Sequence, residues 1–342
     1  MRISLCFILI LFSSTRICSQ NAVAYTERID SIITDVNSYG KVKYVFRYDS
    51  AGMLSERVEY IEKNGRWIDS ERRIYNYDAR GKIALVSVVP PQGEDNSAHF
   101  REEYTYDEKG NLLFMAFKTK ERNGGEWEKK SLREFLYNEK GFLVKRTDDE
   151  YREGERREKF MSEKKYDQKG RLTVSYEYEF RGREKTPRRM YRYSYNKKNQ
   201  LSKKTEYAPD GRNFWRRTRT EWRNYDKSGR LKAVSFSKED KLWGYRTKEE
   251  YHYDTRGNLT QIRSRIYSGG AEEYEKTISF IYAPDTPVSS VMGLNCSEVI
   301  STDWALRENL NLTSKPLSVM VEEKKQQFRP EKALYYYSSL GR

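Results

Sequence analysis

Few residues of this 342-residue chain combine the type and the spacing that enzyme chemistry requires. The two histidines, His99 and His252, lie far apart in the sequence, and neither has a cysteine at metal-ligand spacing. The chain contains no zinc-hydrolase motif, serine nucleophile elbow, phosphate loop or dinucleotide fingerprint. Its many carboxylates recur along charged segments, as on a solvated surface. We therefore expect a protein that is not an enzyme and that holds no metal and no cofactor.

Tryptophans are the residues whose placement best suits ligand binding. Four of them lie near equivalent breaks in the sequence: Trp67, Trp127, Trp215 and Trp243. Exposed indoles at equivalent places would form platforms on which sugar rings stack, since an aromatic ring offers a flat apolar face beside a polar handle. The same spacing also suits packing of long hairpin tips. Both interpretations stay open at this stage.

A short repeated motif, Tyr-Asp-x-x-Gly-x-Leu, must position these side chains. It recurs at intervals of 28 to 31 residues, and a degenerate copy begins at Tyr282. The first tyrosines of the well-formed copies are Tyr48, Tyr77, Tyr106, Tyr137, Tyr166, Tyr195, Tyr225 and Tyr253. A fixed period of this length is the signature of a repeat architecture.

Each motif residue has a mechanical role in a tight turn. The aspartate can accept backbone N–H bonds, and the glycine can adopt the left-handed conformation that ends a type I turn with a bulge. Asn138 and Asn196 replace the aspartate, and Asn199 replaces the glycine with the next most tolerant residue. We assign a structural turn role to Tyr48, Asp49, Gly52, Tyr77, Asp78, Gly81, Tyr106, Asp107, Gly110, Tyr166, Asp167, Gly170, Tyr225, Asp226, Gly229, Tyr253, Asp254 and Gly257.

The strands on either side of the turn are expected to be amphipathic. If the hairpin carries a bulge, Tyr48 lies opposite Leu54, and one face of the sheet carries an aromatic and leucine stripe. We expect the other face to be solvated and to carry alternating positive and negative side chains. The chain has 28 tyrosines and is 34% charged. A tyrosine supplies apolar ring area while keeping its hydroxyl in water, which suits a thin layer.

A less strict second break between the motifs divides each unit into two strands. The sequence therefore predicts an all-β fold, a long antiparallel meander of about nine 29-residue two-stranded repeats. A sheet of that many strands does not stay flat. We expect a twisted, curled single sheet or half-pipe.

The Tyr-Asp-x-x-Gly-x-Leu turns resemble the YD repeats of the RHS family. The alternation of tyrosine, glycine and leucine is also similar to that of exported bacterial MORN-like repeat proteins. The resemblance covers residues 40–287. It implies strand-turn-strand units in an exported, surface-associated protein. RHS-type repeats are wound into shells around a toxin, but the period here is longer and no RHS core is recognisable, so encapsulation is not implied.

The two ends of the chain differ from the repeats. Residues 1–19 resemble a cleaved signal peptide, and residues 20–39 form a leader or cap. Cys18 leaves lipidation open as an alternative, and Cys296 would then be the one cysteine of the mature chain. Residues 288–342 do not continue the repeat and are expected to be a carboxy-terminal cap or a sorting segment. No later segment is apolar enough for a membrane-spanning helix.

These features together predict an exported, non-enzymatic binding scaffold in the periplasm, on the outer-membrane surface or secreted. The expected partner is another protein, with a glycan on the tryptophans or an acidic polymer as alternatives. The net charge of +14 favours the last of these, although the charges are mixed in sequence and not clustered. We expect no specific nucleic-acid binding, and the sequence leaves the oligomeric state open.

Overall fold

The computed structural model describes residues 27–36, 40–90, 100–120, 125–211, 214–238, 245–268, 271–287, 291–292, 314–324 and 331–339. Within these ranges the chain forms strands joined by turns. No helix there is long and apolar enough to cross a membrane. The strands are β1 (Glu27–Val36), β2 (Gly40–Tyr48), β3 (Leu54–Lys63), β4 (Arg66–Tyr77), β5 (Ile83–Val89), β6 (Phe100–Tyr106), β7 (Leu112–Thr119), β8 (Glu128–Tyr137), β9 (Leu143–Arg152), β10 (Glu155–Tyr166), β11 (Leu172–Arg181), β12 (Glu184–Tyr195), β13 (Leu201–Pro209), β14 (Trp215–Tyr225), β15 (Leu231–Lys238), β16 (Tyr245–Tyr253), β17 (Leu259–Ser268), β18 (Ala271–Pro287), β19 (Val291–Met292), β20 (Ser314–Lys324) and β21 (Glu331–Ser339).

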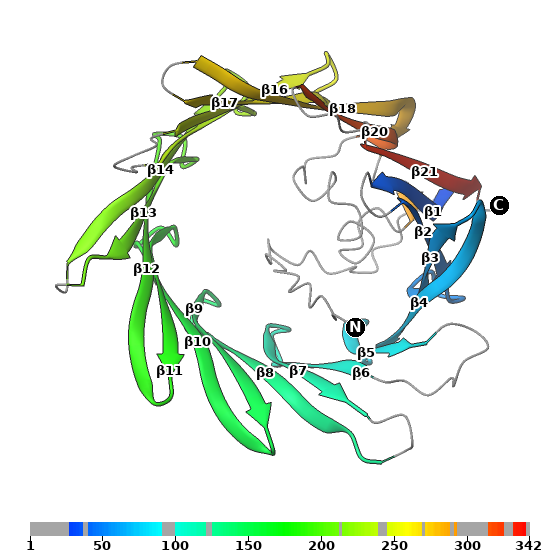
Figure 1. Ribbon diagram of the computed structural model, residues 1–342, viewed down its shortest axis with the longest axis horizontal. Helices are drawn as coiled ribbons and strands as arrows, with labels where there is room; N and C mark the ends of the chain where they lie inside the picture. The colour runs from blue at the N-terminus through cyan, green and yellow to red at the C-terminus, as the bar shows by residue number, and fades with distance from the viewer. Residues whose placement is uncertain are drawn as a thin grey trace.

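The strands form one antiparallel meander that curls into a ring (Figure 1). Each strand from β1 to β18 pairs with the next, and β18 then pairs with β20 and β20 with β21. The last strand, β21, pairs with β1, so the two ends of the meander are hydrogen-bonded to each other. The short β19 pairs with β1 in parallel. The predicted all-β meander in a single curled sheet is confirmed.

The carboxy-terminal segment 288–342 contributes β19, β20 and β21 to this sheet. Its assignment as a cap or a sorting segment stays a prediction. The expected signal segment 1–19 lies outside the described residues, as do His99, Trp243 and Cys296.

The hairpin at each repeated motif has the predicted register. Tyr48 pairs with Leu54, and the register shifts by one residue between Arg47 and Tyr48. The Asp49 N–H donates to the Met53 carbonyl at 2.8 Å, which closes the turn. Gly52 has a φ of 78°, and Asn199, which replaces the glycine in its turn, has a φ of 61°. The left-handed position is therefore present in both forms of the turn.

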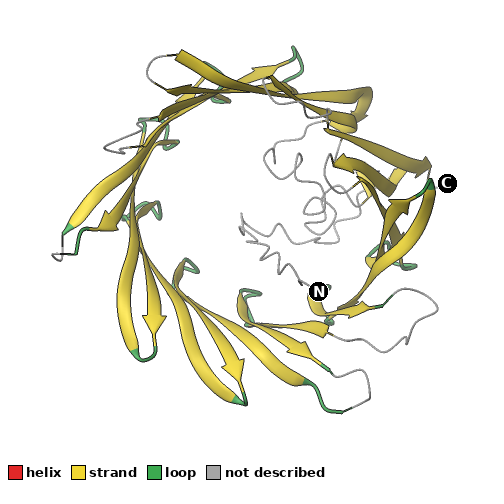
Figure 2. Cartoon of the chain, viewed as in Figure 1, coloured by secondary structure: helices red, strands yellow, loops and turns green. Residues whose placement is uncertain are grey.

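Many of the hairpins at the second break carry a further register shift. It falls between Glu59 and Tyr60, between Phe117 and Lys118, and between Glu177 and Tyr178. A bulge bends its strand and increases the local right-handed twist. Figure 2 shows the hairpins joined at both ends into the curled sheet, and the bulges contribute to that curl where they occur.

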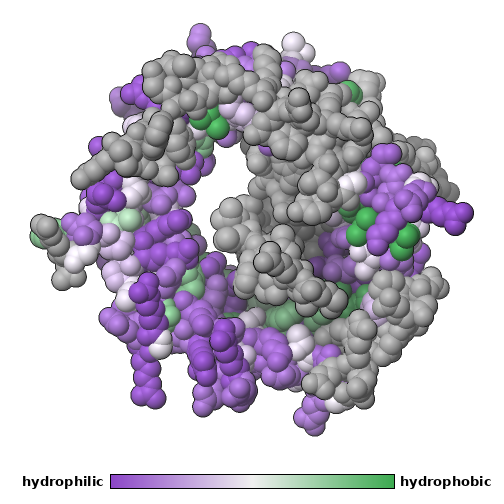
Figure 3. Space-filling model, in the orientation of Figure 1, coloured by the Kyte–Doolittle hydropathy of each residue, from purple (hydrophilic) through white to green (hydrophobic). Residues whose placement is uncertain are grey.

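The face that carries the first tyrosines, here called the tyrosine face, carries an apolar core cluster. This cluster joins strands from both ends of the meander, and each buried side chain contributes about 1.5 to 3 kcal/mol. Its buried members are Ile29, Ile32, Phe46, Leu54, Tyr75, Val86, Leu259, Ile262, Ile278 and Phe280. Apolar atoms, green in Figure 3, line part of the inner wall of the ring.

The opposite face is not the fully solvated ladder that the sequence predicted. Val58, Met161 and Met190 lie on that face by register and are buried. Met190 pairs with Tyr176 on one side and Tyr207 on the other. The alternation of polar and apolar residues in the sequence predicted the face of these side chains but not their burial, because burial depends on which cross-strand neighbours cover them.

Candidate binding surfaces

The aspartate side chain of the motif accepts hydrogen bonds from its own turn. In the turn after β4, Asp78 Oδ1 accepts the backbone N–H groups of Arg80 and Lys82, both at 2.9 Å. The hydrogen bond from the Lys82 N–H, with that of Arg80 and the Arg80 charge, lowers the pKa of Asp78 below its ordinary value. This carboxylate is therefore ionised at neutral pH and acts as a turn acceptor.

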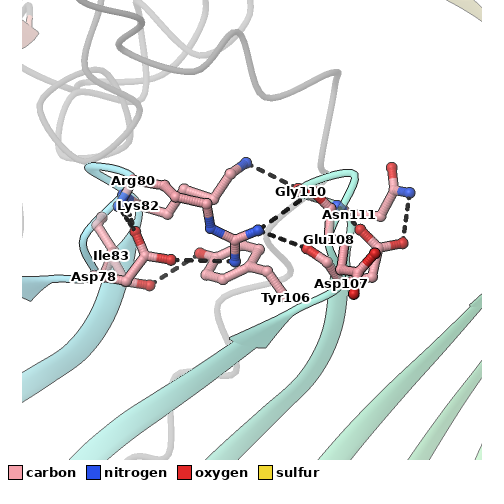
Figure 4. A network of polar contacts seen from close by, with 9 residues as sticks. All are labelled: Asp78, Arg80, Lys82, Ile83, Tyr106, Asp107, Glu108, Gly110 and Asn111. Carbon is pink, nitrogen blue, oxygen red and sulfur yellow. Dashed lines mark hydrogen bonds and ion pairs between the residues drawn. The ribbon is translucent and has the colours of Figure 1, made fainter.

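Side chains connect several of the turns to the next one along the ring. Arg80 donates to the Asp107 carbonyl at 2.8 Å, and the Lys82 ammonium donates to the Gly110 carbonyl at 2.8 Å. Figure 4 shows both side chains reaching across, with the Tyr106 ring between the two turns. Because these bonds end on backbone carbonyls, they fix the position of the neighbouring turn and not only of a side chain.

The motif tyrosines form a second set of links, which corrects the expectation that their hydroxyls stay in water. Each hydroxyl donates to the carbonyl of a residue 19 to 25 positions earlier, at 2.7 to 3.1 Å. The pairs are Tyr48 with Ile29, Tyr77 with Leu54, Tyr106 with Ile83, Tyr137 with Leu112, Tyr166 with Leu143, Tyr195 with Leu172, Tyr225 with Leu201, Tyr253 with Leu231 and Tyr282 with Leu259. The tyrosine is required for its hydroxyl as well as for its ring.

Replacing Tyr106 with phenylalanine should lower the free energy of unfolding by about 1 kcal/mol, because the Ile83 carbonyl loses its donor. Burial raises the pKa of Tyr106 from 10.0 to about 12. The folded state therefore favours the neutral phenol, and its contribution is complete below pH 10 and lost as the pH rises toward 12. Urea unfolding at pH 8 and across this alkaline range measures both effects.

Tyr151→Phe is the matched control, since the Tyr151 ring lies under the Lys129 ammonium at 5.2 Å, a contact that phenylalanine keeps. We expect a loss below about 0.5 kcal/mol for this variant. Equal losses in Tyr106→Phe and Tyr151→Phe would contradict the hydroxyl link.

The residue after the motif glycine was not singled out in the sequence, yet in four repeats it covers the tyrosine of the next repeat. The Lys82 ammonium lies 5.0 Å from the Tyr106 ring centre, and Phe142 stacks on Tyr166 with ring centres 5.0 Å apart. Arg171 and Arg230 lie over Tyr195 and Tyr253 in the same way. The sequence feature that could have indicated this role is a long basic or aromatic residue at this position in four of the copies.

Exposed lysines gather on the turns between β8 and β15. We call Lys140, Lys169, Lys197, Lys198 and Lys227 the lysine rim; all five are exposed. The turn aspartates among them are paired with their own arginines, Arg171 with Asp167 and Arg230 with Asp226, each at 2.7 Å. The charges that look mixed in sequence are therefore segregated here, because residues about 29 positions apart fall on neighbouring turns. The sequence feature that could have indicated the lysine rim is a basic residue that recurs within the motif.

The described tryptophans of the proposed ligand platform have different surroundings. Trp67 is 39% exposed. Trp127 lies under the Arg101 guanidinium, 4.3 Å from its ring centre, and Trp215 packs against Tyr176 with ring centres 6.3 Å apart. Trp243 lies outside the described residues. Trp222, not singled out in the sequence, is also exposed.

An apolar patch lies on the opposite face of β7 and β8. Ala116 pairs with Leu132, and Phe114, opposite Glu134, has Leu132 and Leu136 as its diagonal neighbours. Phe114 is 40% exposed and Leu136 is 57% exposed. We call Phe114, Ala116, Leu132 and Leu136 the β7–β8 patch. Glu134 lies within the patch, opposite Phe114. Lys145, of opposite charge, lies beside the patch, opposite Leu136.

Two carboxylates with raised pKa values, Glu59 and Glu177, lie on strands of the sheet beside arginines. Burial raises the pKa values of Glu59 and Glu177, while neighbouring guanidinium groups, Arg57 and Arg189 respectively, oppose the shift. His252 is exposed. Among the described residues, no group of three or more His, Cys, Asp or Glu side chains is arranged to hold a metal ion.

Comparison with known proteins gives only distant likenesses. No family model matches the sequence, and no curated protein matches it. The Photorhabdus luminescens Tc holotoxin pore and the TcdB2–TccC3 crystal structure each give a TM-score of 0.36, at 11% and 10% identity. The matches cover 73% and 70% of this chain but only 14% and 16% of those chains.

A porin-like protein from Bacteroides uniformis gives a TM-score of 0.30 at 11% identity, over 92% of this chain and 99% of that one. The chain thus spans less than a fifth of the two toxin chains that it resembles. Because all three likenesses are distant, the function is inferred from the chain's own residues.

Proposed function

We propose that this protein is an exported, non-enzymatic scaffold that binds another protein at the cell envelope. The observation that carries the proposal is the β7–β8 patch, in which Phe114 and Leu136 are exposed diagonal neighbours. Large apolar side chains that adjoin on a surface favour burial against a partner. Lys145 lies beside Leu136, and Glu134, whose carboxylate is paired with Arg156, lies between the apolar side chains, so polar groups adjoin the patch as at a protein interface.

The non-enzymatic part of the proposal has two supports. The carboxylates with raised pKa values lie within the sheet beside arginines, which suits cross-strand pairing. Asp49 and its equivalents are occupied by backbone donors of their own turns. Export is proposed from the signal-like residues 1–19.

A protein partner is favoured over a glycan by the state of the tryptophans. A sugar platform needs a free indole face, but Arg101 lies over Trp127 and the Trp215 ring packs against Tyr176. Trp67 is partly exposed at a hairpin end. The tryptophans therefore offer no row of equivalent platforms among the described residues.

Site-specific photo-crosslinking tests the proposal. The photoreactive residue p-benzoylphenylalanine is placed at Leu136, or at the control position Ile281, which is also exposed but lies on β18. We expect one envelope protein to be crosslinked from position 136 and not from position 281. The purified partner should bind Leu136→Glu at least about tenfold more weakly than the native chain, as for a central interface residue.

Ile281→Glu should bind within about twofold of the native chain, since isolated exposed positions contribute little to an interface. Equal crosslinking from both positions, or equal binding by both glutamate variants, would sink the assignment of the β7–β8 patch.

A further inference from the structure

The lysine rim has a charge excess that the turns themselves do not neutralise. Asp167 and Asp226 are each paired with an arginine of the same turn, and the remaining turns carry Asn138 and Asn196 at the aspartate position. The four turns therefore carry five exposed lysines and one further acidic residue, Glu139. From this segregation of charge we infer that the rim binds a linear anionic polysaccharide, whose carboxylate or sulfate groups contact successive turns.

The four turns form a fixed row and not a set of independent loops. Phe142 of the first turn stacks on Tyr166, beside the second. Arg171 of the second donates to Asn199 of the third at 2.9 Å, and Gln200 of the third donates to the Gly229 carbonyl of the fourth at 2.7 Å. The backbone under the lysines is therefore positioned before any ligand arrives.

The spacing of the row suits a polymer. Successive turns are two strands apart, which is about 10 Å at the usual strand separation, so the four turns extend over about 30 Å. A single exposed lysine contributes little to binding of an anion in water. Several in a fixed row act together on one chain, because the first contact raises the effective concentration of the next charged group.

The chemistry of the turns favours a polysaccharide over nucleic acid or an anionic membrane. Single-stranded nucleic acid needs aromatic rings on which bases stack, but Phe142 is already stacked on Tyr166. A membrane surface needs apolar side chains that enter the lipid, whereas the exposed side chains at the tips of these turns are polar or charged: lysine, asparagine, glutamine, serine and glutamate. A hydrophilic chain with regularly spaced anionic groups requires neither.

Fluorescence anisotropy with a labelled heparin octasaccharide tests this inference, using the full chain. The rim variant combines Lys140→Gln, Lys169→Gln, Lys197→Gln and Lys227→Gln. At 50 mM salt we expect it to bind at least about tenfold more weakly than the native chain, with a salt dependence shallower by about three, since each lost charge contact removes roughly 0.7 to 0.9 from the slope. Thermal unfolding should be unchanged, because these side chains are exposed.

The control removes the same number of charges at the second turns: Lys63→Gln, Arg66→Gln, Arg181→Gln and Arg183→Gln, all exposed. It should bind the octasaccharide within about twofold of the native chain, apart from a small uniform loss through net charge. Equal weakening in both variants, or native-like binding by the rim variant, would overturn the inference.

Two further probes test the identity of the ligand. Binding of a single-stranded DNA 20-mer or of phosphatidylglycerol vesicles, without binding of the octasaccharide, would reject the polysaccharide. The lysine rim and the β7–β8 patch share no residue, so failure of this inference leaves the proposed protein interface standing.

Discussion

Replacing Gly170 with alanine should lower the free energy of unfolding by about 3 kcal/mol, although the residue lies in a surface turn. Gly170 has a φ of 76°, and a left-handed alanine costs about 1 kcal/mol. A Cβ atom at this position would lie 2.5 Å from Cζ of Phe142, which belongs to the preceding repeat. Removing that overlap requires Phe142 to leave its stack on Tyr166, an overpacking cost of about 1 to 3 kcal/mol. Urea unfolding followed by tryptophan fluorescence measures the loss.

Gly141→Ala separates the conformational cost from the steric one. Gly141 has a φ of 80°, but a Cβ atom there meets nothing within 4 Å. We expect a loss of about 1 kcal/mol for this variant. Combining Gly170→Ala with Phe142→Ala should cost less than the two single changes added together, because residues in contact are coupled. Equal losses at Gly141 and Gly170 would show that the preceding repeat does not constrain the turn.

Ile32→Ala should cost about 3 kcal/mol, the usual range for a buried isoleucine being about 2 to 5 kcal/mol. Ile32 is fully buried in β1, the strand that pairs with β2 on one side and with β21 on the other. A cavity at this place weakens the junction between the two ends of the meander. We expect amide hydrogen exchange to increase in β1 and β21 before it increases in β10, since strands with weakened packing open locally.

The matched control is Ile74→Ala. Ile74 lies on the opposite face of β4 and is 38% exposed, so its truncation should cost less than about 1 kcal/mol. If Ile32→Ala is as mild as Ile74→Ala, or if exchange in β1 and β21 stays at the native rate, the pairing of the two ends does not stabilise the fold as described.

Both predictions follow from the way the repeats depend on one another. The preceding repeat supplies the acceptor for each motif tyrosine hydroxyl and, in several repeats, the side chain that covers its ring. The Lys82 contact with Gly110 and the Tyr106 contact with Ile83 are examples. Stability in such an array is carried by nearest-neighbour interfaces. A defect in one turn is therefore transmitted to its neighbour and not to the whole ring.

The amino-acid sequence by itself determined the local structure of this protein. Asp49, Gly52 and Leu54 specify their hairpin through interactions within a few residues, so the pairing of Tyr48 with Leu54 follows from turn chemistry. The tolerance of Asn199 for a positive φ follows from the same reasoning. The repeat period then predicted the number of hairpins and the curled sheet that they form.

Only the tertiary structure determined the contacts between neighbouring hairpins. The Tyr106 hydroxyl reaches Ile83, 23 positions earlier, and Phe142 excludes a side chain at Gly170. The lysine rim and the pairing of β21 with β1 also join residues distant in sequence. These contacts depend on the separation and tilt of neighbouring strands and on where the bulges bend them. Those quantities are set by packing across the whole sheet, and a local pattern of residue types does not specify them.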